Sequence, residues 1–187
     1  VGEHTITLTA VDLNGNMNSC TATITVEDNI APQVQCASTI LQLDGSGQAT
    51  LSQADLNASS LDFCGIASSV LDQTLFDCTD IGANTVTLTV TDNNGNVSTC
   101  TATVTIEDNI MPVALCQDAT VQLDVFGVGI LDAEEIDAGS GDACLDTLIL
   151  DETTFGCGNV GNNTVTLTVT DLAGNSSNCT ATVTVED

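Results

Sequence analysis

The sequence predicts an all-β fold made of tandem antiparallel β-sandwich modules, with little or no helix. Three observations lead to this prediction: a repeat of about 80 residues, strands in which apolar residues alternate with threonine, and short glycine-containing turns between them. Hydrophobic residues make up 42% of the 187 residues, whereas aromatic residues make up only 2%. A folded core is therefore expected, built on small aliphatic side chains.

The repeat is clearest at the end of each module. Residues 5–29 recur at 85–109 and again at 164–187, and equivalent cysteines lie 80 and then 79 residues apart. We interpret the chain as a window from a longer array. The predicted modules are the C-terminal part of a truncated repeat at 1–29 and complete repeats at 30–109 and 110–187.

A β-hairpin is predicted at the end of each repeat. In residues 85–91 valine and leucine alternate with threonine, which is the period-two pattern of a strand with one buried face. Asn94-Gly95 then supplies the positive backbone angles of a tight turn. The residues expected on the inner face of the second strand are Cys100, Ala102, Val104 and Ile106.

The first half of each repeat is less regular. Short strands are expected at Val34 to Cys36 and over 40–43, 49–51 and 69–71, because these apolar segments are separated by Gly, Ser and Asp. Helix is expected only as a turn or two, at the positions 52–57 and 133–136.

The charge balance excludes several classes of function. The chain has 26 acidic residues, no Lys or Arg and one His, which gives a formal charge of −26. Nucleic acids and anionic membranes repel such a chain, and P-loop or Schiff-base chemistry lacks its lysine. His4 stands where the other copies have Asn84 and Asn163, so we interpret it as a polar residue at the start of a strand. We expect no catalytic residues, no organic cofactor and no insertion into a membrane.

Nine cysteines indicate an oxidising, extracellular compartment. Four cysteines per repeat allow three pairings, and strand parity favours Cys36–Cys100 because both side chains face inward. Cys64–Cys78 then remains. A zinc site is disfavoured because the sequence has neither a CxxC pair nor a ligand histidine. The equivalent pairs in the second complete repeat are Cys116–Cys179 and Cys144–Cys157, while Cys20 is expected to be unpaired because its partner would precede Val1.

Oxygen ligands gather at the expected joints between repeats, where Ca²⁺ is a candidate. A solvated acidic turn is the alternative, since only three ligands in sequence can be named at each joint. Cadherin linkers are similar in having acidic and Asn residues followed by Pro. The candidate metal ligands are Glu27, Asp28 and Asn29 at one joint and Glu107, Asp108 and Asn109 at the other.

Two kinds of turn in the repeats have alternative interpretations. The segments beginning at Asp12, Asp92 and Asp171 resemble the start of a calcium loop, but a hairpin turn explains them better because their Gly comes one place early. The turn 44–48 of the first complete repeat becomes apolar in the second and contains Phe126. Phe126 is a candidate contact with another chain or with the preceding module, and the alternative is that it covers its own sandwich.

The run DxxGNxxxC, followed by a Glu-Asp pair, a Pro and then Cys36 or Cys116, resembles the hyalin-repeat (HYR) type of immunoglobulin-like module. It is also similar to the tandem repeats of very large bacterial cell-surface and gliding adhesins. The resemblance implies immunoglobulin-like extracellular β-sandwiches with a role in adhesion.

The sequence therefore predicts a non-catalytic segment of a long extracellular adhesin or stalk, stapled by disulfides and stiffened at its joints. Expected partners are the neighbouring repeats and, outside the chain, other copies in a filament or a surface receptor or glycan. Two alternatives remain open: a subunit of a polymeric extracellular fibre, and a ligand-binding accessory module of a secreted enzyme. Acidity as an adaptation to salt is a further interpretation that needs no specific Ca²⁺.

Overall fold

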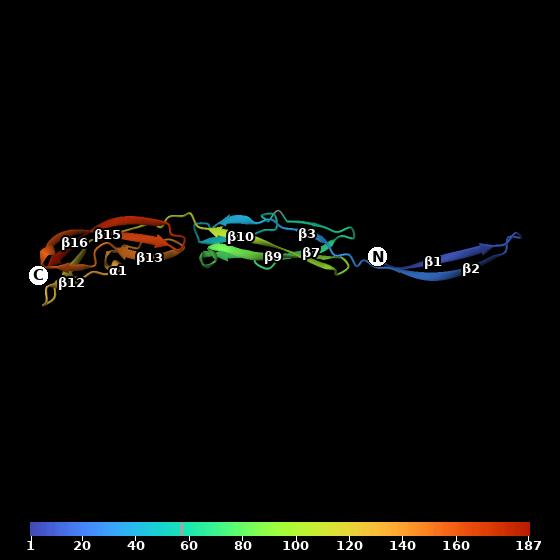
Figure 1. The fold of residues 1–187 in the computed structure, drawn as a ribbon, viewed down its shortest axis with the longest axis horizontal. Coiled ribbons are helices and arrows are strands. Elements are labelled where there is room, and N and C mark those ends of the chain that lie inside the picture. Colours follow the sequence, from blue (N-terminus) through green and yellow to red (C-terminus); the bar gives the residue numbers. More distant parts are fainter. Residues whose placement is uncertain (57) are drawn as a thin grey trace.

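The computed structural model describes residues 1–56 and 58–187, and confirms the predicted all-β class. Three bodies follow one another in a row: a lone hairpin, a middle unit and a C-terminal unit (Figure 1). Among the described strands, no hydrogen-bonded sheet joins two of these bodies. Among the described residues, no helix is long and apolar enough to cross a membrane.

The hairpin consists of β1 (Gly2–Val11) and β2 (Met17–Val26), which pair antiparallel over their full length. Every residue of both strands is exposed. His4 lies in β1 opposite Ile24, near the start of the strand as predicted.

The middle unit contains one four-stranded sheet in the order β4-β10-β9-β7, with β4 parallel to β10. The short pairs β3–β6 and β5–β8 complete the sandwich. Its elements are β3 (Gln33–Gln35), β4 (Thr39–Gln42), β5 (Gln48–Thr50), β6 (Ser59–Leu61), β7 (Ile66–Leu71), β8 (Leu75–Asp77), the 3₁₀ turn η1 (Cys78–Asp80), β9 (Gly82–Asp92) and β10 (Val97–Glu107).

The C-terminal unit repeats this topology with the sheet order β11-β16-β15-β13. Its short strands β12 and β14 pair, and two isolated bridges, Val113 with Gly141 and Cys116 with Asp137, stand where the middle unit has β3–β6. Its elements are β11 (Ala119–Gln122), β12 (Val128–Ile130), α1 (Ala133–Ile136), β13 (Leu145–Leu150), β14 (Thr154–Gly156), η2 (Cys157–Asn159), β15 (Gly161–Asp171) and β16 (Ser176–Glu186).

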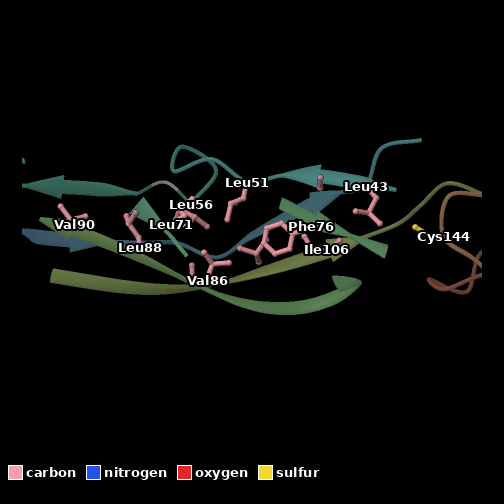
Figure 2. Packing of buried hydrophobic residues seen from close by; sticks show 13 residues of the cluster. Leu43, Leu51, Leu56, Leu71, Phe76, Val86, Leu88, Val90, Ile106 and Cys144 are labelled. Atoms are coloured by element: carbon pink, nitrogen blue, oxygen red, sulfur yellow. The ribbon is translucent and has the colours of Figure 1, made fainter. Parts of the chain in front are cut away.

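The core of each unit lies between the predicted hairpin and the shorter strands. In the middle unit, Val86 and Leu88 of β9 belong to the same buried cluster as Leu51 and Phe76 (Figure 2). The inward residues predicted for β10 are buried at 102, 104 and 106. Alternation with threonine places these side chains on one face because successive residues of a strand point to opposite sides.

Helix is as scarce as predicted. The helical turn expected at 133–136 is α1, and its last residue, Ile136, is buried. At the equivalent place in the middle unit the chain forms a turn over 53–56 rather than a helix, and residue 57 of that predicted segment lies outside the described residues.

Candidate functional site at the joints

Each complete unit contains one disulfide that ties its N-terminal segment to its last strand. Cys36 is bonded to Cys100 and Cys116 to Cys179, with Cα–Cα distances of 5.9 and 5.7 Å. These are the partners that strand parity favours. The bonds close loops of similar length, so each unit is closed around its own core.

The third disulfide joins the two units. Cys78 of the middle unit is bonded to Cys144 of the C-terminal unit, with a Cα–Cα distance of 5.4 Å. The predicted pairs Cys64–Cys78 and Cys144–Cys157 are therefore wrong. Among the described residues, Cys20, Cys64 and Cys157 remain free and exposed.

The length of β9 explains why Cys64 cannot reach Cys78. The carbonyl of Cys64 accepts a hydrogen bond from Nδ2 of Asn93, which follows the last residue of β9. Cys78 lies at the other end, in η1, just before β9 begins. The 11 residues of β9 span roughly 35 Å at 3.3 Å per residue. A disulfide needs Cα atoms within about 7 Å, so each of these cysteines faces a different neighbour.

The intermodular disulfide lies in a tightly packed contact. Sγ of Cys78 is 3.5 Å from the carbonyl oxygen of Ala143 and 3.9 Å from that of Gly47. Cys144 is only 2% exposed and belongs to the buried cluster of the middle unit, beside Leu43 (Figure 2). The prediction that all disulfides lie within a repeat is thus wrong at this joint, where the C-terminal unit contributes a side chain to its neighbour's core.

A second set of contacts at this joint comes from the turn of the next unit. Nδ2 of Asn175 donates to the carbonyl oxygens of Asp108 and Ile110, at 2.9 and 3.3 Å. The same amide group donates to Oδ2 of Asp171 at 2.8 Å. Asn175 therefore connects the β15–β16 turn to the linker that enters the C-terminal unit.

The joint between the hairpin and the middle unit repeats these polar contacts. Nδ2 of Asn96 donates to the carbonyl oxygen of Asp28 at 3.1 Å and to Oδ2 of Asp92 at 2.7 Å. The backbone N–H of Cys64 donates to Oδ1 of Asp62 at 2.7 Å, as that of Cys144 does to Asp142 at 2.8 Å. The first joint thus shares the Asn and Asp-x-Cys contacts of the second but has no disulfide among the described residues.

The DxxGN segments form hairpin turns, as the sequence favours. Oδ1 of Asp92 accepts the backbone N–H groups of Asn94 and Asn96, each at 2.8 Å, and Gly95 has a φ of 90°. Burial raises the pKa of Asp92, but the hydrogen bonds from Asn96, Asn94 and Gly95 outweigh it and lower the pKa overall. Both oxygens of the Asp92 carboxylate thus accept hydrogen bonds within the turn.

Only one of the three predicted ligands at each joint lies in an acidic cluster. Asp28 is grouped with Asp62 and Cys64, and Asp108 with Asp142 and Cys144; in each group the ligand atoms lie within 4.8 Å of one another. Asp62 and Asp142 were not predicted, although their D-x-C pattern recurs in both repeats. The sulfur of Cys144 belongs to the disulfide, so only oxygens remain available in the second cluster.

The other predicted ligands lie outside these clusters. Glu107 accepts a hydrogen bond from Nε2 of Gln42, and Asn109 donates to Oε1 of the same residue. Glu27 and Asn29 are exposed. Neighbouring residues of an extended linker point in different directions, and a role of these four residues as metal ligands stays a prediction.

Electrostatics at the first joint favour a cation. Oδ2 of Asp28 is buried and has no hydrogen-bond partner of good geometry among the described residues. The pKa of Cys64 is raised, first by a side-chain hydrogen bond with Asp28 and further by burial and by repulsion from the carboxylates of Asp28 and Asp62. At the second joint Asp108 is only 5% exposed. The chain has no Lys or Arg to neutralise these carboxylates.

Phe126 lies at the free end of the C-terminal unit and is 85% exposed. Its turn precedes β12, at the end remote from the middle unit (Figure 1). The structure therefore contradicts both a contact with the preceding module and folding back over its own sandwich. A contact with another body stays a prediction.

The comparisons with known proteins agree with the motif. Residues 27–106 match the family model of the HYR domain. This confirms the resemblance for the middle unit, while the bacterial source stays a prediction. No curated protein matches the chain.

Solved structures give distant likenesses to protocadherins. Extracellular cadherin domains 1–4 of protocadherin gamma B7 are 15% identical over 99% of this chain and 58% of theirs, with a TM-score of 0.36. Human protocadherin-24 EC1–2 is 11% identical over 85% of this chain and 100% of its own, with a TM-score of 0.42. The chain spans about three fifths of the gamma B7 structures it resembles. At TM-scores below 0.5 the likeness is too distant to bear on function.

Proposed function

We propose that the chain is a non-catalytic segment of an extracellular adhesin or stalk, in which HYR-type sandwiches transmit force along a row of cross-linked joints. The observation that carries this proposal is the Cys78–Cys144 bond. A cystine between units adds nothing to a catalytic or ligand-binding pocket within one unit. It does prevent two neighbours from separating, which is what a tether requires.

The contacts around the joint support the same role. The bond itself, the insertion of Cys144 into the neighbouring core and the Asn175 contacts to the linker all restrict rotation between units. The row is extended rather than folded back on itself (Figure 1). Tandem modules with restrained joints maintain reach, whereas freely jointed ones collapse toward a coil.

The proposal is tested by X-ray scattering of the oxidised chain and of the double variant Cys78→Ser with Cys144→Ser. The oxidised chain is expected to give the distance distribution of a single rod. The variant keeps both disulfides within units, so its units should fold but bend, which broadens the distribution. An oxidised chain as flexible as the variant would refute a stiff tether.

We further propose that Ca²⁺ is held at the joints by Asp28 with Asp62 and by Asp108 with Asp142. The unpartnered Oδ2 of Asp28 supports this, because a buried carboxylate oxygen is costly without a hydrogen bond or a cation. Carboxylate oxygens suit Ca²⁺, and backbone carbonyls and water would complete its six to eight ligands. When bound, the ion would neutralise charge where two units meet.

Melting in Ca²⁺, in chelator and in NaCl of equal ionic strength tests this second proposal. At a concentration of 100 times Kd, Ca²⁺ should add about 2.7 kcal/mol per occupied site to the free energy of unfolding. The gain should vanish in the double variant Asp28→Asn with Asp108→Asn and persist in Glu27→Gln, whose side chain lies outside the clusters. Equal stabilisation by NaCl would instead show general screening of the acidic chain.

A polymeric fibre is the second candidate function. The exposed Phe126, at the end of the C-terminal unit remote from the middle unit, favours it, because an exposed aromatic side chain is suited to contact with another body. Electron micrographs distinguish the two: a stalk gives single threads, and a fibre gives lateral order. An accessory module of a secreted enzyme predicts a saturable small ligand.

A further inference from the structure

The free cysteines Cys157 and Cys64 stand at the positions of the bonded pair Cys78–Cys144. Cys157 begins η2 as Cys78 begins η1, and Cys64 follows Asp62 as Cys144 follows Asp142. They lie at opposite ends of the two-unit body, Cys64 beside Asn93 at the end that meets the hairpin and Cys157 beside Gly127 at the other end. We propose that Cys157 and Cys64 are half-cystines for further modules of this type, so that every joint of the array carries one disulfide.

The Cys157 half of such a joint already has the geometry of the closed one. Sγ of Cys157 lies 4.0 Å from the carbonyl oxygen of Gly127, compared with 3.9 Å between Cys78 and Gly47. A Cβ placed on Gly127 would lie 2.7 Å from Sγ of Cys157, and one placed on Gly47 would lie 2.7 Å from Sγ of Cys78. Both glycines also have a φ of 72°. The same turn therefore holds the sulfur in the same place, whether or not it is bonded.

The Cys64 half shares its Asp-x-Cys contact with the closed joint, although the residues that follow the cysteine pair differently: Asn93 N–H donates to the carbonyl of Gly65, whereas Leu172 N–H donates to that of Cys144. The hydrogen bond from the Cys64 N–H to Asp62 matches that from Cys144 to Asp142 within 0.1 Å, at 2.7 and 2.8 Å. Cys64 is exposed whereas Cys144 is buried, and the difference is the neighbouring unit that covers Cys144. A preceding module would cover Cys64 in the same way.

The distribution of phenylalanine is an independent observation that points to the same contact. Phe76 and Phe155 are core residues, whereas Phe63 is 100% exposed beside Cys64 and Phe126 is 85% exposed in the turn that touches Cys157. The closed joint has the small residues Ser46 and Ala143 at these places. A joint between Cys157 and Cys64 would bring the two exposed rings to its interface.

The bond forms by thiol–disulfide exchange with a low-molecular-weight disulfide as the oxidant. The thiolate of Cys157 attacks one sulfur of the oxidant, forms a mixed disulfide and releases one small thiolate. The thiolate of Cys64 then attacks the sulfur of Cys157 and releases the second small thiolate. The two protons and two electrons that the two cysteines lose reduce the oxidant to two small thiols.

The test extends the full chain by a second copy of its own residues 29–108, placed directly after Asp187. The added copy then follows Glu186-Asp187 as residue 109 follows Glu107-Asp108, and brings its own Cys64 opposite Cys157. The protein is refolded with oxidised and reduced glutathione and cleaved at Asp and Glu, since trypsin has no site. The original Cys64 is replaced by Ser, so that every Cys64 peptide comes from the added copy, and mass spectrometry of the unreduced peptides identifies the pairs.

The expected result is a bond between Cys157 and Cys64 of the added copy, beside Cys36–Cys100, Cys116–Cys179 and Cys78–Cys144. The matched control Cys157→Ser should leave Cys64 of the added copy open to alkylation. If Cys157 stays alkylatable while Cys78–Cys144 forms, this inference is wrong and the proposed function stands. The inference rests on that proposed function. If Cys78–Cys144 is also missing while both bonds within units form, the proposed function of a cross-linked tether is wrong as well.

Discussion

The two joints of the molecule share their polar contacts but differ in their covalent link. At both, an Asn of the hairpin turn donates to the linker, and an Asp-x-Cys segment stands beside a linker Asp. Only at the second joint does the preceding body provide η1 and its cysteine. The comparison teaches that the polar contacts need only the hairpin and the linker, whereas the disulfide needs the far end of a complete unit.

Removing the covalent link should have the largest effect, because it makes the second joint resemble the first. The double variant Cys78→Ser with Cys144→Ser loses a cross-link of sequence separation 66. Chain entropy predicts a loss of about 4 kcal/mol in the free energy of unfolding, measured by denaturant titration. Cys64→Ser is the matched control and should cost close to nothing, because Cys64 is free and exposed. Equal losses in both would mean that the bond does not form in solution.

A crowded glycine should have the next largest effect. Gly47→Ala places a Cβ 2.7 Å from Sγ of Cys78 and 3.0 Å from Cβ of Ala143, at a φ of 72°. The left-handed backbone alone costs about 1 to 2 kcal/mol. The clash should also hinder formation of the Cys78–Cys144 bond, which would leave Cys78 as a thiol open to alkylation. Gly45→Ala in the same turn meets open space and should leave both readouts unchanged.

The linker contacts should contribute less. Asn96→Ala and Asn175→Ala each remove hydrogen bonds to the linker and to the turn Asp, and should lower the free energy of unfolding by about 1 kcal/mol. Asn94→Ala is the control, because the third copy already has Ala173 there and forms the same turn. Similar losses at the two joints would show that these contacts do not depend on the disulfide.

The smallest effect expected is the acid dependence of the turns. Hydrogen bonds lower the pKa of Asp92 and of Asp12 below the ordinary value near 4. The stability that they contribute is therefore present above about pH 4 and is lost as the pH falls through their lower folded values. In high salt, which screens the other carboxylates, the melting temperature should fall as the pH drops below about 4. This slope should be shallower in Asn96→Ala, and an unchanged slope would contradict the role of Asp92.

The two kinds of hairpin show how far the local pattern reaches. Leu8 and Leu88 occupy the same place in the same alternating strand, yet Leu8 is 71% exposed and Leu88 is 1% exposed. Alternation predicts which face of a hairpin is apolar, and it did so correctly for β9 and β10. Burial depends on what covers that face, and in β1–β2 no described strand does.

The sequence by itself determined the all-β class, the repeat, the hairpin turns and the inward residues of the long strands. It also favoured Cys36–Cys100 and Cys116–Cys179, since parity along a strand is a local property. Only the tertiary structure decided that Cys78 meets Cys144, and which carboxylates gather at a joint. The physical reason is distance: Cys64 and Cys78 lie beside opposite ends of β9, and side chains from different units become neighbours only when the units are stacked.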